Sequence, residues 1–141
     1  MKKILVPVAR NFEDHGAIDE AVKIAKQFGS KIVLLNVDDS KKAMKELDYG
    51  GYISEDKMYE RFKDTSFLEE IKRGYNDEGI EFSILMAEGD PATEIIDEAE
   101  KGDYDLVIMK THTMKERKRF MMGSVSNKVV HHIKVPIMII R

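Results

Sequence analysis

One segment of the chain concentrates residue types that could bind an anion. Residues 110–119 hold five basic side chains and one acidic one, although the chain as a whole carries a formal net charge of −3. The segment then reaches Gly123 and Ser124, where we expect a helix to begin. Unpaired N–H groups and the positive dipole end of a helix start favour an anion, and a glycine lets a phosphate approach the backbone. The segment therefore has the features of a phosphate site, in which Ser124 would be helix N-cap, phosphate ligand or both.

Two other interpretations of this basic segment stay open at this point. The cations could simply keep a loop solvated, or they could contact nucleic acid. A general nucleic-acid binder usually spreads Lys and Arg over a face or along a helix, whereas here they are confined to one segment of an otherwise acidic chain. A local anion site fits this charge distribution better, and we expect no nucleic-acid partner.

Length and composition limit the class of protein. The 141 residues are 43% hydrophobic, enough for the core of one domain spanning 1–141. Cysteine is absent, which excludes disulfides, thiolate nucleophiles and cysteine metal ligands. The first apolar run, Ile4 to Val8, is too short for a signal peptide or a membrane span. We expect a cytoplasmic protein with no membrane partner.

Apolar runs of strand length alternate with amphipathic stretches of helical period. Strands are expected at Ile4 to Val8, Ile32 to Val37, Phe82 to Met86, Leu106 to Met109 and Val135 to Ile140. Helices are expected at 17–28, from about Ser54 to the stop at Gly79, between Asp90 and Gly102, and from Ser124 to Ile133. Continuous apolar strands separated by helices indicate a parallel sheet covered on both faces. The predicted fold is therefore α/β and doubly wound.

Helix ends and inward faces carry their own signals. Asp14 is the expected N-cap of the first helix, Gly29 its expected stop, and Phe28 the last residue of its inward face. The second helix should bury Met58, Phe62, Leu68, Ile71 and Tyr75. In the third, Asp90 should be the N-cap and Pro91 the first helical residue.

The position of the basic segment in such a fold bears on its role. Ligands of open α/β sheets bind beyond the carboxyl ends of the strands, where the strand order reverses. With the order 3-2-1-4-5, the reversal falls between the first and fourth strands. The loops that meet there are Ala9 to Asp14 and Lys110 to Met122. The basic segment would thus border a ligand crevice.

Four segments together resemble the universal stress proteins. They are "KKILVPV", "AVKIAKQFGSKIVLLNV", "GDPATEIIDEAEKGDYDLVIMKTH" and "GSVSNKVVHHIKVPIMII", and the resemblance covers nearly the whole chain except 38–80. It implies a Rossmann-like five-stranded parallel sheet of order 3-2-1-4-5. It also implies a homodimer paired through the last strand, Val135 to Ile140, and an ATP site in one branch of the family. An unidentified protein partner is expected as well.

The ATP-binding branch carries a glycine motif that this chain matches only in spacing. The motif reads Gly, two residues, Gly, nine residues, then Gly followed by Ser or Thr; here these positions are Lys110, Thr113, Gly123 and Ser124. The branch also carries an acid after the first strand, where this chain has Ala9. The crevice that the resemblance implies consists of Pro7, Val8, Ala9, Val37, Lys110, Thr111, Thr113, Gly123, Ser124 and Val125, with the backbone of Val37 facing adenine.

The replaced glycines decide what function we predict. Thr113 would lose about 1–3 kcal/mol in the positive-φ conformation that glycine adopts freely. Lys110 could reach a phosphate or lie across the crevice and fill it, and we expect filling. The predicted function is a non-catalytic cytoplasmic stress-response protein that acts as a homodimer through protein contacts, with a degenerate nucleotide crevice and no cofactor. The alternative is an ATP or AMP sensor, or a slow ATPase, that uses Lys110 and the Gly123–Ser124 helix start for phosphates.

Metal and catalytic chemistry find little support. His131 and His132 are adjacent, so on a helix they point about 100° apart and cannot chelate one metal from one face. His112 lies in the crevice loop without a serine elbow, a pair of catalytic carboxylates or a zinc-binding spacing. We expect neither a metal ligand nor a catalytic residue.

Overall fold

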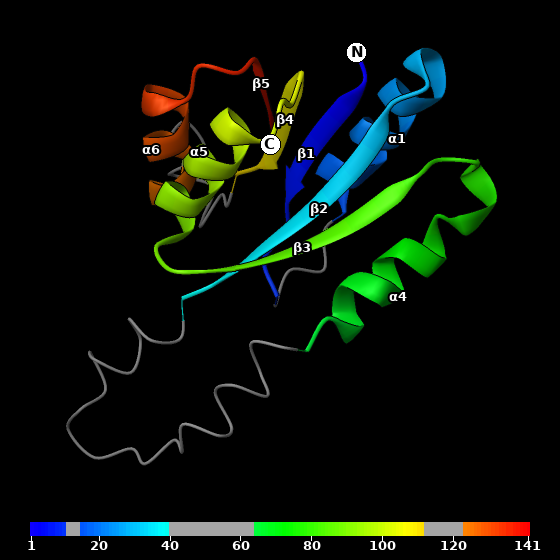
Figure 1. Cartoon of the computed structure of the whole chain (residues 1–141), viewed down its shortest axis with the longest axis horizontal. Coiled ribbons are helices and arrows are strands. Elements are labelled where there is room, and N and C mark those ends of the chain that lie inside the picture. Colours follow the sequence, from blue (N-terminus) through cyan, green and yellow to red (C-terminus); the bar gives the residue numbers. More distant parts are fainter. Residues whose placement is uncertain (11–14, 40–63, 112–122) are drawn as a thin grey trace.

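Helices cover both faces of a five-stranded parallel sheet (Figure 1). The computed structural model describes residues 1–10, 15–39, 64–111 and 123–141. The strands are β1 (Lys3–Pro7), β2 (Lys31–Asp38), β3 (Phe82–Glu88), β4 (Leu106–Lys110) and β5 (Ile137–Ile140). Their order is β3-β2-β1-β4-β5 and every neighbouring pair is parallel. This confirms the predicted α/β fold and its strand order.

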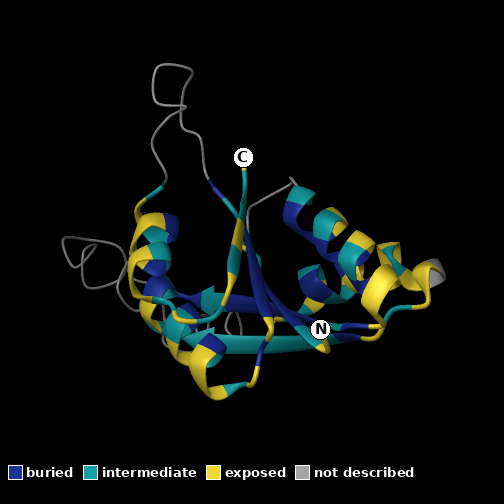
Figure 2. Cartoon of the chain, turned by 90° about the horizontal axis from the view of Figure 1, so that it is seen from above, coloured by how far each residue is buried: buried dark blue, intermediate teal, exposed yellow. Residues whose placement is uncertain are grey.

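The helices form one layer on each side of the sheet, with most of the buried residues between (Figure 2). They are α1 (Gly16–Phe28), α4 (Ser66–Gly74) with the short 3₁₀ helix η1 (Asn76–Glu78), α5 (Pro91–Lys101) and α6 (Ser124–His132). Alternate residues of a strand enter opposite core layers. Ile4 and Val6 of β1 pack with α1 and α4, whereas Leu5 packs with α5 and α6. Strands buried on both faces explain why their sequences are continuously apolar.

Local sequence signals fix the ends of two helices as predicted. The Asp90 side chain caps α5 by accepting a hydrogen bond from the backbone N–H of Thr93, and Pro91 is the first helical residue. Gly29 ends α1 with φ 66°, a left-handed conformation that a residue with a Cβ rarely adopts. Gly79, also left-handed with φ 69°, follows η1.

The structure corrects two details of the helices. Phe28 does not face the core: it is 62% exposed, because the buried stripe of α1 ends at Ala25. The N-cap of α6 is Gly123, and Ser124 is already the first helical residue, so Ser124 caps nothing. His15, without a side-chain bond, precedes α1 in the N-cap position. The predicted cap Asp14 lies outside the described residues.

Only the second part of the second predicted helix lies among the described residues. Within the described residues it begins at Ser66, and it buries Leu68 and Ile71 as expected. Ser54, Met58 and Phe62 lie outside the described residues, so the first part of this prediction is untested.

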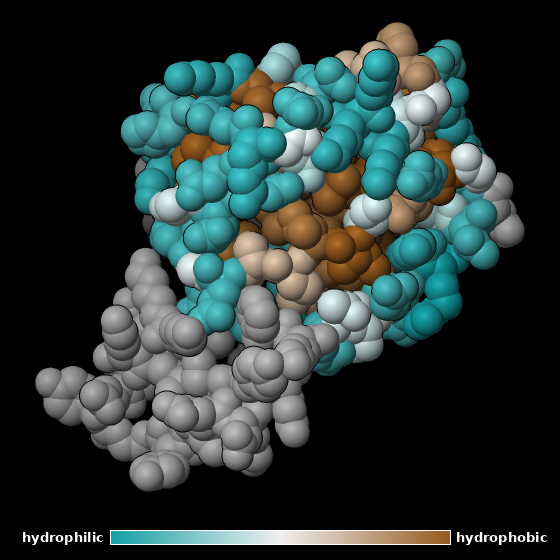
Figure 3. Space-filling view, viewed as in Figure 1, coloured by the Kyte–Doolittle hydropathy of each residue, from teal (hydrophilic) through white to brown (hydrophobic). Residues whose placement is uncertain are grey.

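The edge strand β3 is only partly covered by helices. Phe82 is buried, whereas the other six residues of β3 are partly exposed. In the space-filling view, hydrophobic side chains show along β3 and where α4 meets it (Figure 3).

Among the described helices, none is long and apolar enough to cross a membrane.

Candidate functional site

A cavity of about 330 Å³ opens at the carboxyl ends of β1, β2 and β4. It lies at the point where the strand order reverses between β1 and β4, which is where ligands bind in open α/β sheets. Its lining residues come from six elements and the segments next to them: Val6, Pro7, Val8, Ala9, Arg10, Ala17, Ile18, Leu35, Asn36, Val37, Asp38, Asp39, Pro91, Ile95, Met109, Lys110, Val125 and Ser126. The size is at the lower end of the range for small-molecule sites.

The structure brings together most of the residues that the resemblance placed in a crevice. Those that line the cavity are Pro7, Val8, Ala9, Val37, Lys110 and Val125. Gly123 and Ser124 lie at the start of α6, directly before Val125. Thr111 is buried, and its backbone N–H donates to the carbonyl of Ile140 at 2.9 Å, so it contributes to the β4–β5 pairing. Thr113 is outside the described residues.

Lys110 is anchored at the end of the neighbouring strand. Its Nζ donates a hydrogen bond to the carbonyl oxygen of Arg141 at 2.9 Å. Lys110 pairs with Ile140 across the β4–β5 ladder, so Arg141 is the next residue along the neighbouring strand. The ammonium group of Lys110 is therefore held at the β5 side while the residue still lines the cavity.

The sequence reasoning missed Asn36, which joins the ends of β1 and β2 at the cavity. Asn36 is 3% exposed, and its Nδ2 donates to the carbonyl of Val8 at 2.8 Å. The Val8 N–H donates to the carbonyl of Leu35 at 2.7 Å. A polar residue within the apolar run 32–37 was the signal available, but its partner depends on the register between two strands.

Arg10, also missed, connects the cavity rim to α4. Its Nη2 donates to the Asp64 carbonyl at 3.1 Å, and its guanidinium lies 4.6 Å from the centre of the Phe67 ring. Hydrogen bonds from Ser66 hold the pKa of the Asp64 carboxyl below its usual range, with the nearby Arg10 cation as a smaller cause. This places one fixed cation at the β1 side of the cavity.

The start of α6 forms the wall opposite α1. The Gly123 backbone is extended, and its carbonyl accepts the Asn127 N–H at 2.9 Å in the first helical turn. Ser126 is 3% exposed and lines the cavity beside Val125. The free N–H groups of a helix's first turn can bind an anion at this wall.

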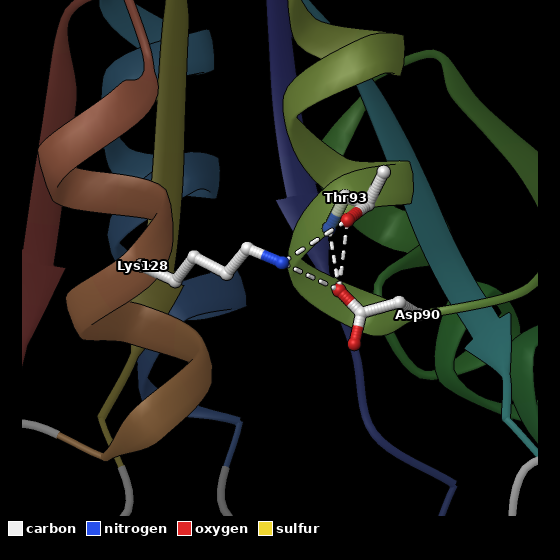
Figure 4. Close-up of polar contacts among 3 residues, drawn as sticks. All are labelled: Asp90, Thr93 and Lys128. Atoms are coloured by element: carbon white, nitrogen blue, oxygen red, sulfur yellow. Dashed lines mark hydrogen bonds and ion pairs between the residues drawn. The ribbon is translucent and has the colours of Figure 1, made fainter.

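A polar cluster between α5 and α6 fixes that wall in place (Figure 4). Lys128 of α6 donates from Nζ to Asp90 Oδ2 at 3.1 Å and to Thr93 Oγ1 at 3.2 Å. Asp90 Oδ2 also accepts from the Thr93 N–H at 3.1 Å and from its hydroxyl at 2.9 Å. Hydrogen bonds from Thr93, and then from Lys128, lower the pKa of Asp90 to about 2. One carboxylate thus caps α5 and binds it to α6.

This cluster predicts a pH-dependent contribution to stability. Asp90→Ala removes the N-cap and should lower the free energy of unfolding by about 1 kcal/mol at pH 7. The pKa of Asp90 is lower in the folded chain than its ordinary value of 3.8. The contribution is therefore present in full above that ordinary value and is lost as the pH falls toward about 2. Urea unfolding of both proteins between pH 7 and pH 2 should show the difference shrinking over this range.

Lys128→Met is the matched control for that experiment, because it removes the exposed ion pair with Asp90 and the bond to Thr93 Oγ1 but leaves the N-cap intact. It should cost about 0.5 kcal/mol or less. A loss as large as that of Asp90→Ala would contradict the assignment of the main effect to the cap.

Metal binding finds no support in the part of the chain that the structure describes. No group of three or more His, Asp or Glu side chains there could hold an ion. His131 and His132 are both exposed on the last turn of α6.

The comparisons with known proteins agree with this geometry. The model of the universal stress protein family matches residues 1–141. The chain belongs to the universal stress protein family. Among its relatives is the universal stress protein MJ0531 of Methanocaldococcus jannaschii, 26% identical over 99% of this chain and 82% of that protein.

Two solved universal stress proteins share the fold. One, from Archaeoglobus fulgidus, is in complex with dAMP (TM-score 0.66, 21% identity, 100% of this chain and 98% of that one). The other, from Arabidopsis thaliana, has AMP bound (TM-score 0.64, 20% identity, 99% and 91% covered). At these identities the likeness establishes the fold of this universal stress protein and nothing finer.

Proposed function

We propose that this universal stress protein is a non-catalytic cytoplasmic stress-response protein that binds a nucleoside monophosphate of the AMP type in its crevice. The observation that carries the proposal is the cavity of about 330 Å³ at the switch point, which stays open beside Lys110. Its volume falls within the range of small-molecule sites. The nucleotides bound by the two solved relatives support the same ligand class.

One phosphate, rather than three, suits the groups around this cavity. The first turn of α6, which begins at Ser124, could bind a first phosphate through its backbone N–H groups. Further phosphates would depend on backbone donors in the glycine motif, and this chain has Lys110 and Thr113 in two of the glycine positions. The anchoring of the Lys110 ammonium at Arg141 gives no phosphate ligand in their place.

Calorimetric titration of the purified chain tests the proposal. AMP should bind with a micromolar dissociation constant, and ATP about tenfold more weakly because its outer phosphates lack backbone donors. Adenosine, which has the base and ribose without a phosphate, is the matched ligand control and should also bind more weakly than AMP. Absence of heat with all three would contradict the proposal and favour the second candidate, a degenerate crevice in a protein that acts through protein contacts alone.

The proposal includes a homodimer formed through β5. The strand lies at the edge of the sheet, its four residues are all apolar, and Met138 is 36% exposed. An apolar edge strand offers unpaired backbone groups to a second chain. Two copies of β5 side by side would satisfy these groups.

A further inference from the structure

We infer that Asn36 is a positioning residue of the crevice, because it keeps the backbone N–H of Val37 available to a ligand. The inference rests on the proposed nucleotide function for the identity of that ligand. It rests on the strand geometry of β1 and β2 for everything else.

The backbone N–H groups of successive β2 residues point alternately toward β1 and toward β3. Odd-numbered residues donate toward β1: the N–H of Lys31 bonds to the carbonyl of Lys2 at 2.8 Å. Even-numbered residues donate toward β3: the N–H of Ile32 bonds to Glu81 at 2.9 Å. In a parallel ladder the N–H and C=O of one residue face the same neighbour. Both backbone groups of Val37 therefore face the β1 side, where the residue lines the cavity.

The β1–β2 ladder stops one hydrogen bond before Val37. The Val8 N–H bonds to Leu35, so the next bond of a continuing ladder would run from the Val37 N–H to the carbonyl of Val8. The register of β1 with β2 ends at the Pro7–Leu35 pair within the described chain, so this last bond is not formed. The Val8 carbonyl instead accepts the Asn36 side-chain amide at 2.8 Å.

The substitution of a side-chain donor for a backbone donor has a functional consequence. Asn36 is buried, so its amide holds the Val8 carbonyl without competition from solvent. Val37 then presents one donor and one acceptor, side by side, to the cavity. The complementary ligand edge has an acceptor next to a donor, as the N1 atom and the 6-amino group of adenine do. Asn36 thus acts through Val8 and Val37 on the base end of the ligand, at the opposite side from the α6 phosphate site.

Amide hydrogen exchange and ligand affinity in Asn36 variants test this inference. In Asn36→Leu the Val8 carbonyl loses its side-chain donor and should draw in the Val37 N–H, which completes the ladder. Exchange of the Val37 amide without ligand should therefore become slower, although general loosening of the fold would make it faster. The affinity for AMP should fall about tenfold. The affinity for ribose 5-phosphate, which lacks the base, should stay within about twofold.

Controls separate this role from a merely structural one. Asn36→Ala removes the same donor without added bulk and should act in the same direction if Asn36→Leu does not fold. Ser30→Ala removes another buried side-chain bond to a carbonyl, that of Met1, at the other end of β2, and should leave Val37 exchange and AMP affinity unchanged. In the wild type without ligand, a Val37 amide as protected as that of Leu35 would overturn the inference. If the wild type binds no AMP, the proposed function fails, but the exchange comparison still decides the role of Asn36.

Discussion

The combined variant Ala9→Asp, Lys110→Gly and Thr113→Gly is expected to bind ATP at least about tenfold more tightly than the wild type. Ala9 lines the cavity and is exposed, so a carboxylate there could accept hydrogen bonds from ribose hydroxyls. Glycine at 110 removes the side chain anchored at Arg141, and glycine at both motif positions allows backbone N–H groups to approach the outer phosphates. Calorimetric titration with ATP measures the gain.

A control must separate this effect from the loss of one positive charge. Lys134→Gly removes an exposed lysine between α6 and β5 and should leave ATP affinity as it is. The AMP affinity of the triple variant should rise less than its ATP affinity, because only the outer phosphates gain donors. A folded triple variant, checked by circular dichroism, that binds ATP no better than the wild type would contradict our account of the lost glycines.

The helices and strands could be predicted from the sequence because their ends and buried faces depend on residues that are close together in the chain. Asp90 and Pro91 meet the donor and φ requirements of a helix start within four residues. Gly29 similarly supplies a conformation that its neighbours could not. By contrast, Ser124 has the residue type of an N-cap, but the extended backbone of Gly123 takes that position. Residue type alone does not fix which of two adjacent residues leaves the helix.

Some features of the candidate site could likewise be predicted from the sequence, and others could not. Its location followed from strand order, Lys110 from motif spacing and Val37 from the family resemblance, and both residues line the cavity. The anchoring of Lys110 could not be predicted, since its acceptor belongs to residue 141 on another strand. The role of Asn36 depends on the β1–β2 ladder ending at Pro7. A ladder longer by one hydrogen bond would pair the Val37 N–H with the Val8 carbonyl. Sequence pattern specifies which face a strand residue occupies, but not where its ladder stops.

The proposed dimer yields the second large expected effect: Ile139→Pro should raise the dissociation constant of the homodimer at least about tenfold. The carbonyls of Pro136 and Ile140 accept hydrogen bonds from β4. The backbone N–H and C=O groups of the even-numbered residues of β5 therefore point toward β4. Ile139 consequently directs its N–H outward, where a second copy of β5 could accept it. Proline removes this donor and leaves the β4–β5 ladder bonds in place, as is tolerated on edge strands. Sedimentation velocity from nanomolar to micromolar concentration measures the shift toward monomer.

Two further variants decide what such a shift means. Met138→Lys keeps every backbone donor but places a charge on the exposed side chain of the same edge, and it should also weaken the dimer. Phe28→Lys changes a more exposed hydrophobic residue at the end of α1 and should leave the oligomeric state unchanged. An effect of Phe28→Lys equal to that of Met138→Lys would assign the interface to α1 rather than to β5. A wild type that is monomeric at micromolar concentration would remove the dimer from the proposal, while the crevice chemistry could still be tested by AMP titration.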